Sequence, residues 1–221
     1  MSRIGIMGGT FNPIHKAHKK LAYEAYRQFE LDYVIFIPTG DPPHKKGMDI
    51  TSGFHRYNMV NLCIEDIPYF KISDMELTRK GYSYSYVTLE ELRKQYPEDE
   101  FYFIIGGDSL FQIEDWREPA KVLQLAVILA AGRNHVSVED FTQQEEYLEK
   151  KYGADIRRIE FADMDISSSD IRRLLAEDFQ GEDLLIEDAV SKKDIEKLLD
   201  EKVYNYIKEN GLYKSGEING I

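Results

Sequence analysis

Cysteine is almost absent: the 221 residues include one, Cys63, so no disulfide can form within the chain. The sequence also lacks an apolar run long enough to cross a membrane, and neither a secretory apolar segment nor a twin arginine stands near its first residues. These absences argue against a disulfide-stapled secreted protein and against a membrane protein. We therefore expect a cytoplasmic protein without a membrane partner, in which Cys63 packs on the apolar side of a helix.

Positive charge is also scarce. Lysine and arginine together number 28, against 40 aspartates and glutamates, which gives a formal net charge of −12 and a pI of about 4.9. This balance argues against the basic surface that a nucleic acid requires, and we expect no nucleic-acid partner. A protein that handles small phosphates would instead gather its few cations locally, and the groups that stand out are His15 with His18, His44-Lys45-Lys46, Arg133 and Arg172-Arg173.

What the chain does contain is an alternation of short apolar runs with segments of helical periodicity. Such runs, when glycine or proline ends them, are typical of strands in a parallel sheet covered by helices on both faces. The length suits one α/β domain. We predict a single domain over residues 1–221, with a doubly wound parallel sheet and C-terminal helices. Within it, the acidic stretch 177–201 is a helical insertion with a helix from Lys192, and residues 215–221 are a tail. The predicted strands are Arg3–Met7, Tyr33–Pro38, Tyr69–Ser73, Phe101–Ile105, Leu125–Ala131 and Ile156–Phe161, and the predicted helices include Phe54–Ile64, Phe141–Tyr152 and Val203–Lys214.

The segment after the first predicted strand combines glycines with histidines. Gly8 and Gly9 end the strand, and helical spacing begins at about Lys16. A glycine loop between a strand and a helix start points free backbone N–H groups and the helix dipole at an anion. His15 and His18 are three residues apart at this helix start, so both can face one point. An ordinary turn and a metal site are the alternatives, but no third metal ligand stands at a recognisable spacing. The pattern favours an anion site.

This loop reads Gly8-Gly9-Thr10-Phe11-Asn12-Pro13-Ile14-His15-Lys16-Ala17-His18. It resembles the G-G-T-F-D-P-x-H-x-G-H motif of the nucleotidylyltransferase superfamily. The resemblance implies a Rossmann-like nucleotidylyltransferase fold and contacts to ATP from Gly8, Gly9, Thr10, Phe11, His15 and His18. Asn12 and Ala17 depart from the motif, and the methyl group of Ala17 stands where a glycine would let the substrate lie close to the helix.

A second anchor is the segment Ile166–Arg172, I-S-S-S-D-I-R. Serines followed by Asp170 make a strong helix N-terminus. Their hydroxyl groups, together with Arg172 one turn later, could also bind a phosphate. The segment resembles the I-S-S-T-x-I-R motif of the same superfamily, and this resemblance implies that Ser167, Ser168 and Arg172 hold the β- and γ-phosphates of ATP.

The fourth predicted strand is followed by Gly106-Gly107-Asp108. A glycine at the carboxyl end of a strand leaves room for a flat base, and Asp108 can accept a hydrogen bond from a ribose or an amine. Ligands of doubly wound sheets bind outside these strand ends, where the strand order reverses. The run I-I-G-x-D also matches the superfamily, so Gly106 and Asp108 are predicted to contact ATP.

Further segments resemble nicotinate mononucleotide adenylyltransferases. The loop Pro42–Lys45 is typical of them and implies that Lys45 contacts phosphates. Tyr84-Ser85 stands where that family has S-Y-T and helps to hold the nicotinate ring, Trp116 stands where it has a stacking platform, and Arg133 matches an arginine associated with phosphates. From residue types alone, the lysine loop could be a solvated turn, Ser83 or Ser85 could cap a helix, and Trp116 could be core packing.

The resemblance implies transfer of an adenylyl group from ATP to nicotinate mononucleotide, giving nicotinate adenine dinucleotide and pyrophosphate in NAD biosynthesis. The predicted catalytic residues are His15, His18, Lys45 and Arg172. Mg²⁺ is expected as cofactor, held mainly by phosphates and by no predicted protein ligand. The expected partners are the two small molecules, and assembly as a homo-oligomer stays open, as does the preference for nicotinate over nicotinamide. The alternatives are a phosphopantetheine adenylyltransferase, a cytidylyltransferase and a non-catalytic nucleotide-binding module. A redox dinucleotide enzyme is disfavoured because no G-x-G-x-x-G follows a strand.

Overall fold

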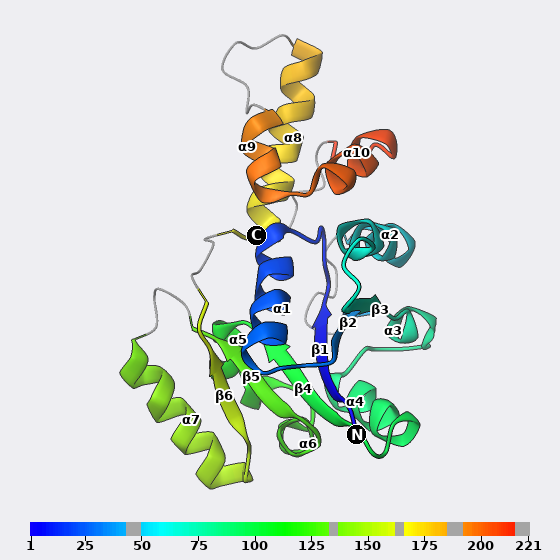
Figure 1. Cartoon of the computed structure of the whole chain (residues 1–221). Coiled ribbons are helices and arrows are strands. Elements are labelled where there is room, and N and C mark those ends of the chain that lie inside the picture. The colour runs from blue at the N-terminus through cyan, green and yellow to red at the C-terminus, as the bar shows by residue number, and fades with distance from the viewer. Residues whose placement is uncertain (43–49, 133–136, 162–165, 185–191, 215–221) are drawn as a thin grey trace.

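The computed structural model describes residues 1–42, 50–132, 137–161, 166–184 and 192–214 (Figure 1). Within these ranges, six strands form one sheet in the order β3-β2-β1-β4-β5-β6, and every neighbouring pair is parallel. The predicted doubly wound parallel sheet is therefore confirmed. The strands are β1 (Arg3–Gly9), β2 (Tyr33–Pro38), β3 (Phe70–Ile72), β4 (Glu100–Ile105), β5 (Val127–Ala131) and β6 (Ile156–Ile159).

Helices follow almost every strand. They are α1 (Lys16–Gln28), α2 (Gly53–Ile64), α3 (Met75–Thr78), α4 (Ser85–Gln95), α5 (Gly107–Phe111), a 3₁₀ turn at Ile113–Asp115, α6 (Pro119–Leu125), α7 (Val138–Tyr152), α8 (Ser168–Leu184), α9 (Lys192–Leu198) and α10 (Glu201–Glu209). The prediction of a helix from Lys192 is confirmed by α9. The predicted closing helix begins earlier, at Glu201, and ends before Gly211, whose φ of +61° turns the chain.

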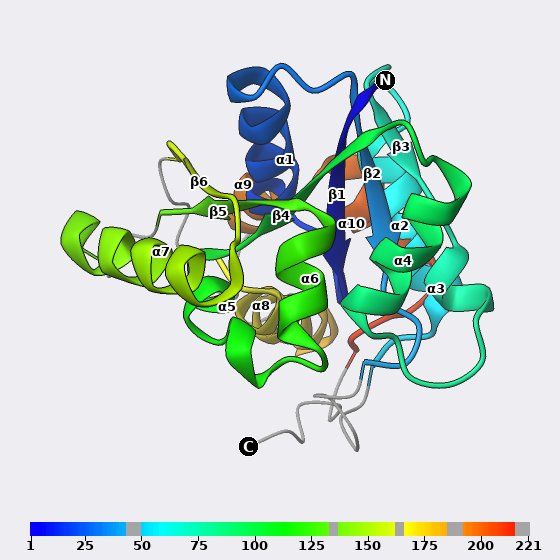
Figure 2. The ribbon, with the colours of Figure 1, turned by 90° about the horizontal axis from the view of Figure 1, so that it is seen from below.

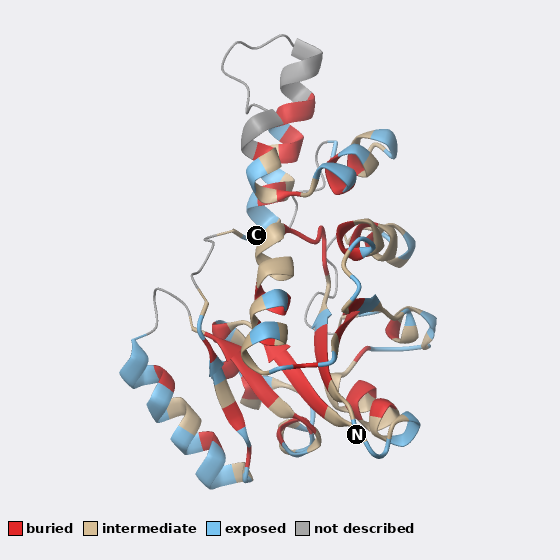
Figure 3. Cartoon of the chain, viewed as in Figure 1, coloured by how far each residue is buried: buried red, intermediate tan, exposed pale blue. Residues whose placement is uncertain are grey.

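Successive side chains of each strand point to opposite faces of the sheet, and each face builds its own core. Ile35 and Ile37 pack with Leu89 of α4 and Leu123 of α6. Phe36, which lies between them, packs in the other cluster with α1 and α2. Figure 2, seen from below, shows α1 and α6 on opposite sides of the sheet. Because both faces are covered, the central strands are buried along most of their length (Figure 3).

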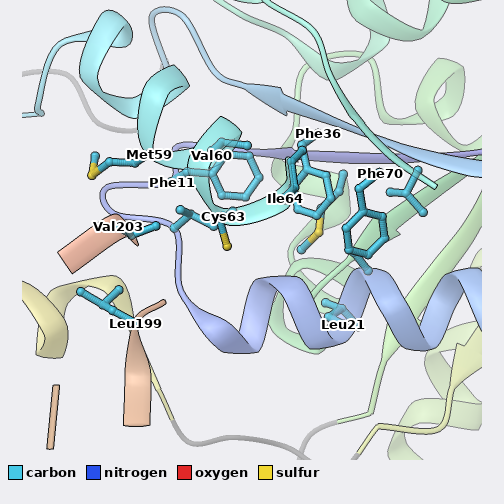
Figure 4. Packing of buried hydrophobic residues seen from close by; sticks show 14 of the residues in the cluster. Phe11, Leu21, Phe36, Met59, Val60, Cys63, Ile64, Phe70, Leu199 and Val203 are labelled. Atoms are coloured by element: carbon cyan, nitrogen blue, oxygen red, sulfur yellow. The ribbon is translucent and has the colours of Figure 1, made fainter. Parts of the chain in front are cut away.

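The C-terminal helices α8, α9 and α10 stand at the carboxyl end of the sheet (Figure 1). Leu199 and Val203 pack in the same cluster as Cys63 and other apolar side chains of α2 (Figure 4). Asp200 joins the C-terminal helices to α1 and α2. Its carboxylate pairs with Lys19 of α1 and accepts a hydrogen bond from the Cys63 thiol of α2 at 3.0 Å. Burial raises the pKa of this thiol. The first part of the acidic stretch 177–201 continues α8 to Leu184.

Candidate active site

A cavity of about 510 Å³ opens at the carboxyl ends of the two central strands. Gly8 and Gly9 line it at the end of β1, and Ile105 and Gly106 line it at the end of β4. These strands are neighbours in the sheet, and the strand order reverses between them. Doubly wound sheets bind their ligands at this switch point. The cavity therefore lies where the fold itself favours a ligand.

Most of the predicted site residues surround this cavity. The lining includes Gly8, Gly9, Thr10, His15, His18, Tyr84, Ser85, Gly106, Trp116, Ser167 and Ser168. Phe11, Asp108 and Arg172 are described but do not line it. Lys45 and Arg133 lie outside the described residues. The structure thus gathers predicted residues from both ends of the chain, and their roles in binding and catalysis stay predictions.

His15 and His18 form a close, tilted pair of rings at the start of α1. Their ring centroids are 3.7 Å apart and the rings are tilted by 31°. His15 occupies the N-cap position with extended backbone angles, and its N–H donates to Nδ1 of His18 at 3.3 Å. In a neutral imidazole one ring nitrogen accepts and the other carries the proton. This hydrogen bond therefore places the proton of neutral His18 on Nε2.

His15 is the more buried of the pair, with 5% of its surface exposed. Burial lowers its pKa to about 4, because the charged imidazolium would lose its hydration. His15 is accordingly neutral at pH 7. Its buried Nδ1 has no hydrogen-bond partner within the described part of the chain. The electrostatic character of this site thus comes from oriented dipoles and N–H groups rather than from a charged His15.

A consequence of this burial is sensitivity to acid. The folded-state pKa of His15, about 4, lies below the usual 6.5 of a histidine, so the unfolded chain takes up a proton first and stability is lost as the pH falls from 6.5 toward 4. At about 1.4 kcal/mol per pKa unit, the loss between pH 7 and pH 4.5 is roughly 2–3 kcal/mol. Urea denaturation of the wild type and of His15→Gln at both pH values measures it. Between pH 7 and pH 4.5, the free energy of unfolding of His15→Gln should fall by about that amount less than that of the wild type. Equal losses in the two proteins would contradict a buried neutral His15.

Arg56 of α2 holds the loop that leads to the histidines. Its side chain is buried, and it donates to the carbonyl oxygens of Thr51 at 2.8 Å, Thr10 at 2.8 Å and Gly40 at 3.4 Å. These carbonyls belong to two loops at the carboxyl end of the sheet, since Thr10 follows β1 while Gly40 and Thr51 both lie between β2 and α2. A guanidinium offers five N–H donors in a fixed fork, and it can therefore join several loops at once. Arg56 fixes the wall of the cavity near Thr10 without lining it.

The start of α8 holds the same loop from the other side. Ser168 Oγ donates to the carbonyl oxygen of Pro13 at 3.0 Å, and Arg172 Nη1 donates to that of Asn12 at 2.8 Å. Ser167 acts as a cap, since its Oγ accepts from the N–H of Asp170 at 3.1 Å. Capping therefore accounts for Ser167, while Ser168 and Arg172 join two segments that are far apart in the sequence.

The segment before α4 forms another part of the cavity wall. The alternative interpretation, in which Ser83 or Ser85 caps this helix, is wrong, because α4 starts at Ser85 with Tyr84 at the N-cap position and no side-chain cap. Ser83 is buried instead, and its Oγ accepts from the N–H of Gly40 at 3.1 Å. Gly40 is required at this contact, since a Cβ there would lie 2.1 Å from the carbonyl oxygen of Glu76.

Several residues line the cavity that the sequence did not single out. They are Glu76, Thr88 and Arg117, among others. Glu76 is buried, accepts from the Thr88 hydroxyl at 2.6 Å, and has its pKa raised by burial. The sequence allows Trp116 to be interpreted either as a wall of the binding site or as core packing, and its position fits both. It lines the cavity and packs edge-on against Phe103 with ring centroids 6.2 Å apart.

The described residues contain no group of three or more histidine, cysteine, aspartate or glutamate side chains placed to bind a metal ion. No helix within the described ranges has both the length and the apolar character needed to span a membrane.

Comparisons with known proteins identify the family of this chain. A family model described as cytidylyltransferase-like matches residues 6–174. A Clostridium botulinum protein named "Probable nicotinate-nucleotide adenylyltransferase" is 39% identical over 214 residues, which cover 97% of this chain and 99% of that protein. A Desulfitobacterium hafniense protein of the same name is 41% identical, covering 96% of each chain.

Among solved structures, the nicotinic acid mononucleotide adenylyltransferase of Plasmodium falciparum in complex with NaAD superposes with a TM-score of 0.77 at 21% identity. The match covers 98% of this chain and 99% of that one. At this identity the likeness shows the fold, while the curated relatives show the family. The cavity at the switch point, the paired histidines and the full-length similarity lead to one conclusion: the chain belongs to the nicotinate-nucleotide adenylyltransferase family.

Proposed function

We propose that the protein transfers the adenylyl group of ATP to nicotinate mononucleotide, forming nicotinate adenine dinucleotide and pyrophosphate in NAD biosynthesis. One observation carries the proposal. One cavity is lined by two histidines whose rings are in close contact, by the start of α8 at Ser167 and Ser168, and by the aromatic side chains of Tyr84 and Trp116. The names of the full-length relatives support the same reaction.

In this reaction an oxygen of the mononucleotide's 5′-phosphate attacks the α-phosphorus of ATP in line. A new P–O bond forms, the bond from the α-phosphorus to the bridging oxygen breaks, and pyrophosphate leaves with the electron pair. The attacking phosphate is already ionised at pH 7, so no general base is required. The protein's contribution is to position two anions and to stabilise the charge that develops between them.

The residues of the first loop and of α8 suit the triphosphate. His18 would donate its Nε2–H to the α-phosphate region, beside the neutral ring of His15. Ser168 and Arg172 would hold the leaving pyrophosphate. Hydrogen bonds to Asn12 and Ser169 occupy two of the five N–H groups of Arg172, so donors remain for a phosphate.

Other groups would complete the ATP site. The Gly8, Gly9 and Thr10 backbone lies along the cavity, and a Cβ at Gly106 would meet no protein atom within 4 Å, which leaves room for the base. Asp108 would accept from the ribose, and Phe11 supports the site through its edge-on contact with His18, at 5.1 Å between ring centroids. Lys45 and Arg133 are assigned to phosphates by resemblance alone.

Mg²⁺ would enter as part of the substrate, MgATP. The described residues offer no group of carboxylates or histidines to hold a resident ion. Its coordination would therefore fall to phosphate oxygens and water, which suits an ion that keeps much of its hydration.

The nicotinate ring would lie against Trp116, near Tyr84 and Ser85. Ser85 is the first residue of α4, and the first N–H groups of a helix have no partner within the helix. Such groups favour a carboxylate, which nicotinate carries and nicotinamide does not. The same segment is fixed to its neighbours through Ser83 and Gly40.

Pyrophosphate release tests the proposal. MgATP is offered with nicotinate mononucleotide, nicotinamide mononucleotide or phosphopantetheine, and CTP replaces ATP in a parallel series. We expect the highest kcat/KM with ATP and nicotinate mononucleotide. A higher value with phosphopantetheine or with CTP would reassign the substrate, and no pyrophosphate with any pair would support a non-catalytic nucleotide-binding module.

A further inference from the structure

The loop that leads to His15 is held by the very end of the described chain. Tyr213 follows α10, has only 6% of its surface exposed, and donates its hydroxyl to Oδ1 of Asn12 at 2.8 Å. These two residues are 201 positions apart in the sequence. Asn12 is itself 4% exposed and lies three residues before His15. The contact therefore joins the C-terminal turn directly to the loop that carries the histidines.

Asn12 is a meeting point for three segments. Its Oδ1 also accepts from the N–H of Thr51 at 3.3 Å, and its main-chain carbonyl accepts from Arg172. An asparagine carbonyl oxygen has two lone pairs, and Tyr213 and Thr51 use both of them. Because each donor comes from a different part of the chain, loss of one leaves the loop free to shift toward the others.

The backbone of Tyr213 supports the same interpretation. Its φ is +65°, a left-handed conformation that is unfavourable for a residue with a Cβ atom. Such a conformation persists only when its surroundings fix it in several ways. Here the buried ring and the hydrogen bond to Asn12 do so. Strained residues of this kind cluster at sites where geometry must be held precisely.

We infer that Tyr213 is a positioning residue for the adenylyl transfer: through Asn12 it fixes the loop that presents His15 and His18 to the phosphates. The inference rests on the proposed function. It makes the segment after α10 part of the active-site framework, although Tyr213 does not line the cavity.

The first test is Tyr213→Phe in the full chain, which removes one hydroxyl and keeps the ring. With MgATP and nicotinate mononucleotide, kcat should fall about tenfold with little change in KM, which is less than the hundredfold that a shift of about 1 Å can cost. Tyr204→Phe is the matched control. It removes a buried hydroxyl of the same helical unit that donates to Asp178 at 2.8 Å, so it should lower the melting temperature without lowering kcat.

A second variant approaches the same hydrogen bond from its acceptor. Asn12→Leu should reproduce the loss of kcat, and adding Tyr213→Phe to it should lower kcat no further, because interacting residues are not additive. Independent, multiplicative losses would overturn the inference. So would a Tyr213→Phe enzyme whose kcat stays within about twofold of wild type while its melting temperature falls as in Tyr204→Phe.

A spectroscopic measurement separates this inference from the proposed function. The ring ¹⁵N resonances of His15 and His18 should move in Tyr213→Phe and stay in place in Tyr204→Phe, whether or not any substrate is turned over. If the wild type transfers no adenylyl group, the proposed function fails and these spectra alone decide whether Tyr213 positions the histidines. Unchanged histidine spectra in Tyr213→Phe would overturn the inference.

Discussion

Replacing His18 with alanine should lower kcat by about 10²- to 10³-fold while KM for ATP changes little, the range seen when one donor to a developing anionic charge is removed. The imidazole lines the cavity, and its Nδ1 accepts from the His15 N–H, so the neutral ring carries its proton on Nε2, and we expect this N–H to donate to the α-phosphate. Charge on this phosphate changes most in the transition state. A contact that strengthens there appears in kcat rather than in KM. Pyrophosphate release at saturating substrates measures it.

The alanine variant also removes a helix cap, and His18→Asn separates the two effects. An asparagine side-chain oxygen can accept from the His15 N–H, as Nδ1 of His18 does, but it cannot reach as far as Nε2. We expect His18→Asn to keep the melting temperature of the wild type and to remain as slow as His18→Ala. His55→Ala serves as a second control, because His55 bonds to Tyr206 and does not line the cavity. A His18→Asn enzyme with nearly normal kcat would remove His18 from the chemistry.

The strands could be predicted because their signal is local. An apolar run such as Phe101–Ile105 is buried on both faces, so the residues themselves carry the pattern, and β4 extends it by one residue at Glu100. The run from Leu125 is shorter than expected, because Leu125 ends α6 and the strand begins at Val127. Short helices such as α3 and α5 were not predicted, since four or five residues are too few to display a helical period.

The residues of the candidate site likewise divide into those recognisable from local sequence and those that depend on contacts made by the fold. Glycines, histidines and serines at a strand end or a helix start have a chemistry that can be recognised in sequence, and His15, His18 and Ser168 do line the cavity. Glu76 could not be recognised in this way, because a glutamate in a short helix is ordinary until burial raises its pKa and Thr88 donates to it. Tyr213 likewise gains its importance only from a contact with Asn12 that the fold creates.

Arg56→Met should lower the free energy of unfolding by roughly 3–5 kcal/mol, the range expected when a buried charge–dipole network loses its central partner. Methionine has a similar length but no donor, so the carbonyls of Thr51, Thr10 and Gly40 would each be left without this hydrogen bond in a buried place. Arg56→Lys keeps the charge, but an ammonium on a flexible stem cannot reach three carbonyls with the geometry of the guanidinium fork. The free energy of unfolding of Arg56→Lys should therefore lie between those of the wild type and Arg56→Met.

Denaturant unfolding measures these losses, and Arg27→Met is the matched control. Arg27 is exposed and pairs with Glu24 one turn away at 2.8 Å, a kind of contact worth less than about 0.5 kcal/mol. Activity adds a second readout, because Thr10 lines the cavity and is one of the residues that Arg56 holds. Far below its melting temperature, Arg56→Met should still turn over more slowly than the wild type, while Arg27→Met should not. If Arg56→Met were as stable as Arg27→Met, the two loops would have to be held by their other contacts, and the guanidinium would not be what fixes the wall of the cavity.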